Sequence, residues 1–278
     1  AIPCSIIAAM SIEQMGAVLL AFEGMSILSL LIQKKRIPAV IWIQTAITFV
    51  AFVILFMAPG NEMRVASEIT TWMPGYKELS VGNHVFMTIQ WMLSSFANEG
   101  KAFFIAIWAA GFLLLMKSKK AKVYQILAVV FSVVALLPYA GISFFSEMGI
   151  GYIDIEQRLT ELPTWQTMNI QNRIAFFWWI AAVLFTMVLL WKVTGHSVFI
   201  SMVFLGGIAS EAVLYFSPTI YASGARVYYL TDLMYLFIIL WMVMHMDSEK
   251  KKNLFIAGVV VLGVANFLSQ YSIMLLKL

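Results

Sequence analysis

Four acidic residues lie inside long apolar stretches of this sequence, where packing alone does not explain them: Glu13, Glu23, Glu211 and Asp232. A carboxylate in hydrocarbon costs about 3 kcal/mol or more, so such a residue normally faces a polar cavity or an ion-pair partner. A carboxylate beside a cavity can accept a proton from a hydroxyl group, as a general base does. We therefore take Glu13, Glu211 and Asp232 as candidate catalytic residues. Glu23 is the deepest of the four, and we expect it to be protonated and hydrogen-bonded to a Ser or Gln side chain, or to line a polar cavity. Asn266 and Gln270 of the last apolar stretch are candidate partners.

The segment 58–61, Ala-Pro-Gly-Asn, ends an apolar stretch and is followed by Arg64. Proline at the second position and glycine at the third favour a type II turn, because proline pre-sets φ and glycine accepts a positive φ. Such a turn would place Asn61 and Arg64 close enough to contact one ligand. The planar fork of an arginine suits phosphate oxygens.

A second segment, 217–226, repeats this arrangement, with Ser217-Pro218 followed by Gly224 and Arg226. Both segments end an apolar stretch with proline and carry an arginine a few residues later. The candidate substrate-binding residues are therefore Asn61, Arg64 and Arg226, together with Arg173 from another polar segment.

A simpler explanation of the same residues stays open. Each proline can be a plain helix end followed by an arginine that extends to solvent. Glu211 or Asp232 can pair with Arg226 or Arg173 and thereby only stabilise the bundle.

These segments resemble a family of uncharacterised bacterial membrane proteins that carry an A-P-G-N-x-x-R segment after a transmembrane helix. The matching residues here are 58–64, Ala-Pro-Gly-Asn-Glu-Met-Arg, and the later 217–226, Ser-Pro followed by Arg226. The stretch 11–14, Ser-Ile-Glu-Gln, is also similar. Such proteins are grouped with GT-C-like glycosyltransferases, which transfer sugars from polyprenyl-phosphate donors at the outer face of the membrane.

That resemblance implies a mechanism in which a carboxylate deprotonates the acceptor hydroxyl and basic or amide groups hold the departing lipid phosphate. In GT-C enzymes the key acid usually lies in the first outer loop. The chain begins at Ala1, without a methionine, and we expect it to be the C-terminal portion of a longer protein. Glu13 is then the early, outward-facing acid available as a base.

The elements that must position these residues are apolar helices. A span needs about 20 apolar residues to cross a bilayer. The sequence predicts an all-α, polytopic transmembrane helix bundle forming one domain over 1–278, with outer segments at 59–96 and 143–173. We expect about eight spans: 11–32, 39–58, 97–116, 123–142, 174–194, 197–216, 227–246 and 254–276.

Basic residues gather in every second loop, which predicts the orientation of the chain. Eleven of the eighteen Lys and Arg residues lie near positions 34–36, 117–122, 192 and 250–252. Cytoplasmic loops collect such residues, so we expect these loops inside and residue 1 outside, in a bacterial inner membrane.

Composition excludes several other classes of protein. At 62% hydrophobic and 12% charged residues, with a mean hydropathy of +0.89, the chain could not stay soluble as one globule. One cysteine and three scattered histidines argue against a metal site, and the cofactor stays unknown. The positive charge of the loops indicates contact with a lipid bilayer and no nucleic-acid partner.

Two classes of function remain, with a third reading beside them. The first is a glycosyltransferase-type protein that handles a polyprenyl-phosphate-linked sugar at the outer face. The second is a transporter or flippase whose buried acids line a polar pathway. The polar candidates gather in the outer half of the predicted spans, which favours the enzyme, since a pathway needs polar groups at mid-depth and on both sides. A non-catalytic membrane scaffold is the third reading.

Overall fold

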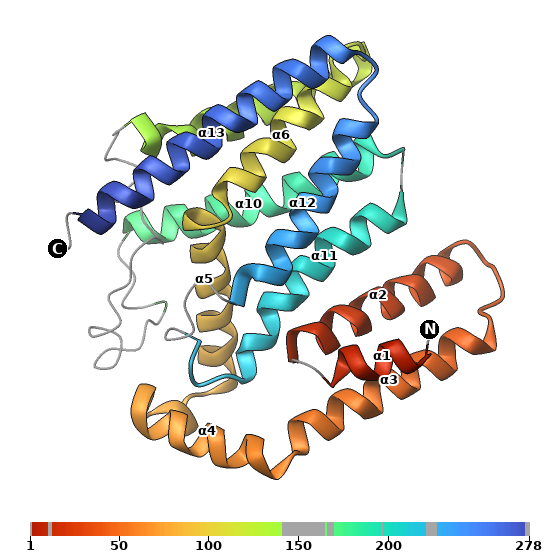
Figure 1. Ribbon diagram of the computed structural model, residues 1–278, viewed down its shortest axis with the longest axis vertical. Helices are drawn as coiled ribbons and strands as arrows, with labels where there is room; N and C mark the ends of the chain where they lie inside the picture. The colour runs from red at the N-terminus through yellow and green to blue at the C-terminus, as the bar shows by residue number, and fades with distance from the viewer. Residues whose placement is uncertain are drawn as a thin grey trace. The chain divides into compact units, whose positions relative to one another are not determined.

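The computed structural model describes residues 2–10, 13–140, 165, 170–195, 197–220 and 227–275. Over these residues the chain is all-α, with helices joined by short connections and no strand (Figure 1). The fold class predicted from the sequence is therefore confirmed. The chain divides into two compact units, which we describe one at a time. The first unit contains the described residues in 2–92, 165 and 198–234, and the second those in 93–140, 170–197 and 235–275.

The first unit is built around α2. Its elements are α1 (Ile2–Ala9), α2 (Glu13–Ile32), α3 (Ala39–Met57), α4 (Pro59–Trp72), η1 (Tyr76–Glu78), the start of α5 (Val81–Asn98), α11 (Val198–Ala212), η4 (Val213–Phe216) and the start of α12 (Tyr229–Met244). α2 packs against α3 on one side and α11 on another. Glycines allow these close approaches, because a Cβ at Gly16 would overlap the ring of Phe52 in α3. A Cβ at Gly206 of α11 would lie 3.3 Å from the ring of Phe22.

The second unit has an aromatic core. Its elements are the end of α5, α6 (Lys101–Leu115), η2 (Lys119–Ala121), α7 (Lys122–Leu136), η3 (Leu137–Ala140), α10 (Ile170–Val193), the end of α12 and α13 (Glu249–Leu275). Trp108 of α6 is fully buried, and its indole N–H donates to the Thr186 hydroxyl of α10 at 2.8 Å. The rings of Phe131 and Phe185 stack at 4.9 Å between centroids. This packing satisfies the buried indole donor.

Several helices are long and apolar enough to cross a membrane. Among the described residues these are α2, α3, α10 from Arg173, α11 with η4, and α13 to Leu268. α5 and α6 qualify together but are bent by 69° at the break between them, and α12 is a shorter apolar helix. Each of the eight expected spans contains a helix, and α6, α7 and α11 have 15 residues each and α12 has 16. Large apolar side chains also face outward, as in Trp42, Phe49 and Ile54 of α3. A lipid bilayer is the environment that suits such a surface.

The expected type II turn at 58–61 is wrong. Ala58 has φ −59° and ψ 129°, and Pro59 is the first residue of α4. Gly60 lies inside this helix, and the glycine with positive φ in the described chain is Gly195. Proline suits the first helical position because its missing N–H needs no partner there. The motif therefore joins two helices, and Figure 1 shows α4 continuing the chain directly after α3. The stretch 83–95 belongs to α5.

Candidate functional site: an ion pair between the starts of two helices

An ion pair links the start of α2 to α4 in the first unit. Nη2 of Arg64 lies 2.8 Å from Oε1 of Glu13, and Nε of Arg64 lies 3.8 Å from Oε1 of Glu68. The Arg64 side chain is 54% exposed, against 29% for Glu13 and 25% for Glu68. The guanidinium group is therefore shared by two carboxylates and is still open to solvent.

Local sequence explains this geometry. Pro59 fixes where α4 begins, so Arg64 falls in its second turn, and Glu68 follows one turn later on the same face. Glu13 is in the first turn of α2, where a negative charge interacts favourably with the helix dipole. Of the three acids expected near Arg64, Glu13 is the one that pairs with it in the described structure.

The connection between α4 and α5 is anchored by a small core. The buried residues of this core are Met73, Met87, Trp91, Leu214 and Ile220. Beside it, the Tyr76 hydroxyl donates to the backbone carbonyl of Tyr215 at 3.2 Å, and the His84 ring lies edge-on to Tyr76 at 4.7 Å. Burial, with a smaller effect of Tyr215, raises the pKa of Tyr76, which keeps its hydroxyl a donor. These contacts fix α4, and Arg64 with it, against the segment after α11.

The residue that follows the second arginine segment contacts the same end of α2. The side-chain amide of Gln14 donates to the backbone carbonyl of Val227 at 2.8 Å. Gln14 follows Glu13 directly, and Val227 follows Arg226 directly. The start of α2 therefore contacts Arg64 of the first segment and Val227, the residue after the second segment. Arg226 itself lies outside the described residues.

Helix ends from α3, α11 and α12 gather at this end of the first unit. The rings of Phe56, in the last turn of α3, and Phe216, which ends η4, are 5.5 Å apart. The Thr231 hydroxyl donates to the backbone carbonyl of Gly207 at 3.1 Å and so ties the first turn of α12 to α11. We call this region the Arg64 end: the starts of α2, α4 and α12 with the ends of α3 and α11.

The remaining candidate acids also belong to these helix ends. Glu211 is in the last turn of α11 and only 1% exposed, and Asp232 is in the first turn of α12 and half-buried. Asn61 lies in the first turn of α4, and its side chain is outside the described part of the structure. Arg173 lies in the first turn of α10, in the second unit, so its approach to Arg64 stays a prediction.

Glu23 has a partner that we did not predict, and its expected contact with Asn266 or Gln270 stays a prediction. The buried carboxyl group of Glu23 accepts a hydrogen bond from the Thr48 hydroxyl of α3 at 2.8 Å. Asn266, in the second unit, instead accepts a hydrogen bond from the Tyr139 hydroxyl at 2.7 Å. The side chain of Gln270 lies outside the described residues.

Hairpin symmetry could have found the correct partner. Glu23 lies nine residues before Ile32, the end of α2, and Thr48 lies nine residues after Ala39, the start of α3. In an antiparallel helix pair such positions are at the same height. Two other contacts near Glu13 and Arg64 were not predicted. Glu68 could have been found from its spacing of four residues from Arg64, whereas nothing in the sequence indicates the hydrogen bond of Gln14 to Val227.

No family model, curated protein or solved structure matches the chain. Within the described ranges, no group of three or more His, Cys, Asp or Glu side chains is placed to hold a metal ion. The chemistry of the Arg64 end therefore has to be argued from its carboxylates, its guanidinium group and its surroundings.

Proposed function

We propose that this chain is a GT-C-like, glycosyltransferase-type membrane protein that handles a polyprenyl-phosphate-linked sugar at the outer face of a bacterial inner membrane. One observation carries the proposal. The Glu13–Arg64 ion pair lies next to the Gln14–Val227 hydrogen bond, so the start of α2 contacts Arg64 through one residue and the neighbour of Arg226 through the next. A guanidinium group beside a general base is the minimum that transfer from a lipid phosphate requires.

In this proposal the ion pair is the resting arrangement of the site. A lipid phosphate competes with Glu13 for the exposed guanidinium group of Arg64, since phosphate oxygens suit the same planar donors. Arg226, with Asn61 and Arg173, supplies further donors. Once Arg64 turns to the phosphate, the Glu13 carboxylate is released to act as a base.

The reaction itself balances with these groups. The acceptor oxygen forms a bond to the anomeric carbon while the bond from that carbon to the phosphate oxygen breaks. The lipid phosphate leaves with the electron pair, and a carboxylate takes the hydroxyl proton. Glu13 is the first candidate for that carboxylate, with Glu211 and Asp232 of the neighbouring helix ends as the others.

The binding step can be tested with the full chain in lipid nanodiscs and a polyprenyl phosphate as the probe. Arg64→Gln and Arg226→Gln should each weaken binding by roughly 10- to 100-fold, because a hydrogen bond to a charged group contributes about 1.5–3 kcal/mol. Arg36→Gln, in a lysine-rich loop, is the matched control and should leave binding unchanged. Equal affinity of all three variants and the parent would refute a phosphate site at the Arg64 end.

A transporter or flippase is the second candidate, and the buried Glu23 favours it. This carboxyl group lies midway along α2, hydrogen-bonded to Thr48, where a membrane pathway would need a polar group. A flippase moves a fluorescent lipid across proteoliposomes, and Glu23→Gln should slow that movement. Lipid movement in the parent without sugar transfer would favour this candidate over the enzyme.

A further inference from the structure

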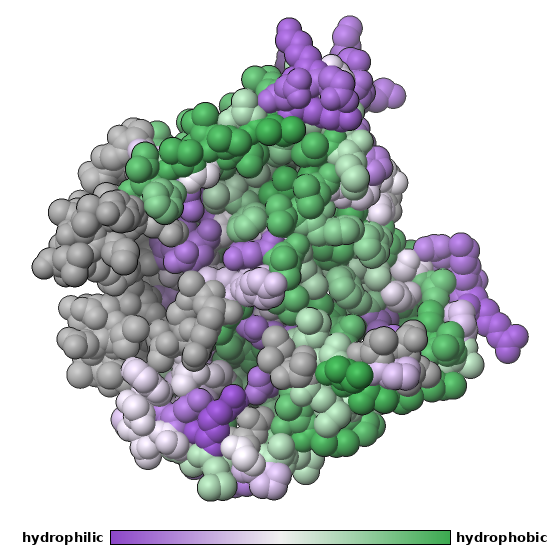
Figure 2. All heavy atoms as spheres, viewed as in Figure 1, coloured by the Kyte–Doolittle hydropathy of each residue, from purple (hydrophilic) through white to green (hydrophobic). Residues whose placement is uncertain are grey.

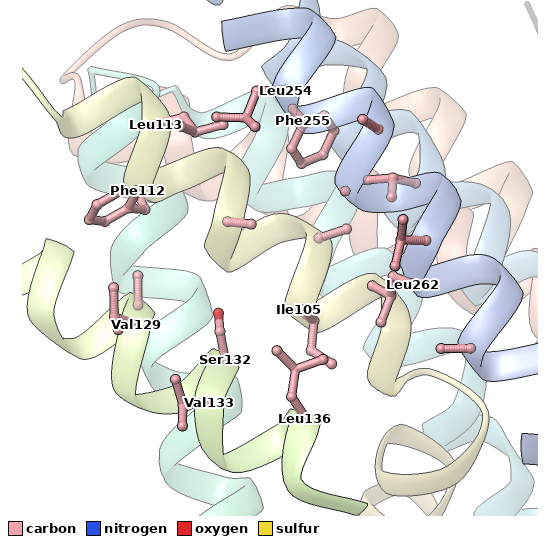
Figure 3. Close-up of a pocket in the computed structure, with 18 of the residues that line it drawn as sticks. Ile105, Phe112, Leu113, Val129, Ser132, Val133, Leu136, Leu254, Phe255 and Leu262 are labelled. Atoms are coloured by element: carbon pink, nitrogen blue, oxygen red, sulfur yellow. The ribbon is translucent and has the colours of Figure 1, made fainter. Parts of the chain in front are cut away.

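The second unit contains a cavity of about 670 Å³ between α6, α7 and α13. Figure 3 shows Ile105 of α6, Ser132 of α7 and Leu262 of α13 around the same space. The lining is apolar except for the hydroxyl groups of Ser132 and Tyr139. A volume of this size lies within the range of roughly 300–1,000 Å³ that is common for ligand sites.

Small residues keep the cavity open. Ala106 and Ala109 of α6 face the space, as do Ala257 and Gly258 of α13. A Cβ added at Gly258 would meet no atom within 4 Å, so the helices leave room there. Apolar side chains beside an empty space forfeit dispersion contacts, which favours an apolar occupant.

One end of the cavity is polar and lies beside the basic side chain of Lys101, which interacts electrostatically with Glu99. Tyr139 lines the cavity, and its hydroxyl donates to Oδ1 of Asn266 at 2.7 Å. That bond uses the carbonyl oxygen of Asn266, so its amide N–H groups can donate to another group. Nζ of Lys101 lies 4.4 Å from the centre of the Tyr139 ring, at the N-terminus of α6. Glu99, two residues before Lys101, is the nearest acid in the sequence.

We propose that this cavity binds one acyl chain of an anionic glycerophospholipid, whose phosphate lies at Lys101 and Asn266. The charge of Lys101 selects an anionic headgroup, and the apolar lining accepts the hydrocarbon chain. The bilayer around the exposed apolar helices supplies such lipids at high local concentration. This site lies wholly in the second unit and does not depend on the function proposed for the Arg64 end.

Binding of the acyl chain in the cavity is tested by photocrosslinking in nanodiscs that contain phosphatidylglycerol with a photoactivatable acyl chain. We expect mass spectrometry to find the crosslinks on the cavity-lining faces of α6, α7 and α13. Gly258→Phe should abolish them, because the new ring fills the space that the chain needs. Gly263→Phe is the matched control. It lies on the same helix, also meets no atom at its Cβ, does not line the cavity, and should leave the crosslinks unchanged.

Ser132→Phe is a second filling variant, from α7, for use if Gly258→Phe does not fold. Crosslinks spread evenly over all lipid-facing helices, or crosslinks that survive both filling variants, would overturn the proposal.

The headgroup half is tested by Lys101→Met, which removes the charge and keeps a side chain of similar length. In the parent, phosphatidylglycerol should crosslink about tenfold more than phosphatidylcholine, the ratio that one charge-assisted contact gives. Lys101→Met should remove this preference, whereas Lys77→Met, at an exposed position in η1, should keep it. Equal crosslinking of both lipids in the parent, or a polyprenyl phosphate that alone displaces the probe, would contradict an anionic glycerophospholipid as the occupant.

Discussion

Two ion-pair clusters, one in each unit, have opposite compositions. In the first unit one guanidinium group, that of Arg64, is shared by two carboxylates. In the second unit one carboxylate is shared by two ammonium groups, because Asp247 lies 2.7 Å from Lys117 and 2.9 Å from Lys251. The Lys251 ammonium also donates to the backbone carbonyl of Leu113 at 2.8 Å, which ties the start of α13 to the end of α6.

The Lys251 cluster is a clamp, by which we mean a contact that holds two helix ends together. The Arg64 cluster has the exposure that the proposed binding site requires. The Lys251 side chain is only 14% exposed and holds two partners, so it fixes two helix ends together. The Arg64 side chain is 54% exposed and can exchange one carboxylate for another anion. Figure 2 shows hydrophilic atoms gathered where α13 begins, the lysine-rich end of the second unit. The predictions below test this contrast, from the largest effect to the smallest.

The largest effect concerns the side of the membrane on which each cluster lies. In a Cys4→Ser background, Gly75→Cys, which follows α4, should react with an impermeant thiol reagent in intact cells. Lys35→Cys and Lys119→Cys should be protected until the membrane is opened, because cytoplasmic loops collect lysine and we predict that these loops lie inside. Labelling of Lys119→Cys but not of Gly75→Cys would reverse the orientation and place the Arg64 end inside.

Neutralising the clamp should destabilise the protein. Lys251→Met should lower the free energy of unfolding in detergent by about 1–3 kcal/mol, since it leaves the Leu113 carbonyl without its charged donor and Asp247 with Lys117 alone. Lys252→Met, which removes an i,i+3 pair with the exposed Glu249, is the control and should cost about 0.5 kcal/mol or less. A clamp is ruled out if the two variants unfold alike.

Removing the hydrogen bond to the buried Glu23 should cost less stability than removing Lys251. Thr48→Val keeps the shape of the side chain but removes the hydroxyl that donates to Glu23, and should cost about 0.5–1.7 kcal/mol. Thr45→Val removes a hydroxyl that bonds only to the Ile41 carbonyl of its own helix. Thermal unfolding of the two variants compares them, and an equal loss would mean that the Glu23 bond contributes nothing beyond a helix contact.

The smallest effect is a dependence on pH. Hydrogen bonds from Lys117 and Lys251 lower the pKa of Asp247 from 3.8 to about 2. A lowered pKa means that the folded state binds the proton less readily than the unfolded state. The stabilisation is therefore complete above pH 3.8 and is lost as the pH falls through 2. Asp247→Asn should flatten the pH dependence of unfolding in this interval, and an unchanged slope would show that the carboxylate is not paired in solution.

Much of the fold could be predicted because apolar periodicity and loop charge act locally. The helix spans follow from runs of residues such as 39–57, which contain no charge. The junction at Pro59 was missed because the same four residues suit a turn or a helix start. The residues after Asn61, from Glu62 to Trp72, continue as a helix, and this favours a helix start over a turn at Pro59.

The site was predictable in its residues more than in its contacts. Glu13 was identified because a carboxylate in an apolar span costs free energy, and Arg64 because an arginine follows a helix end. Their pairing depends on how α4 leaves α3, which no local pattern encodes. Glu23 shows the opposite case, since the symmetry of one hairpin would have been enough to predict Thr48.

The central claim is that Arg64 and Arg226 face one ligand, and intramolecular crosslinking tests it most directly. In a Cys4→Ser background, the pair Arg64→Cys with Arg226→Cys is treated in membranes with a bifunctional thiol reagent no longer than two arginine side chains. The pair Glu13→Cys with Arg64→Cys is the positive control, because these side chains are in contact. We predict that both pairs crosslink. Crosslinking of the control pair without that of Arg64→Cys and Arg226→Cys would contradict the shared phosphate site.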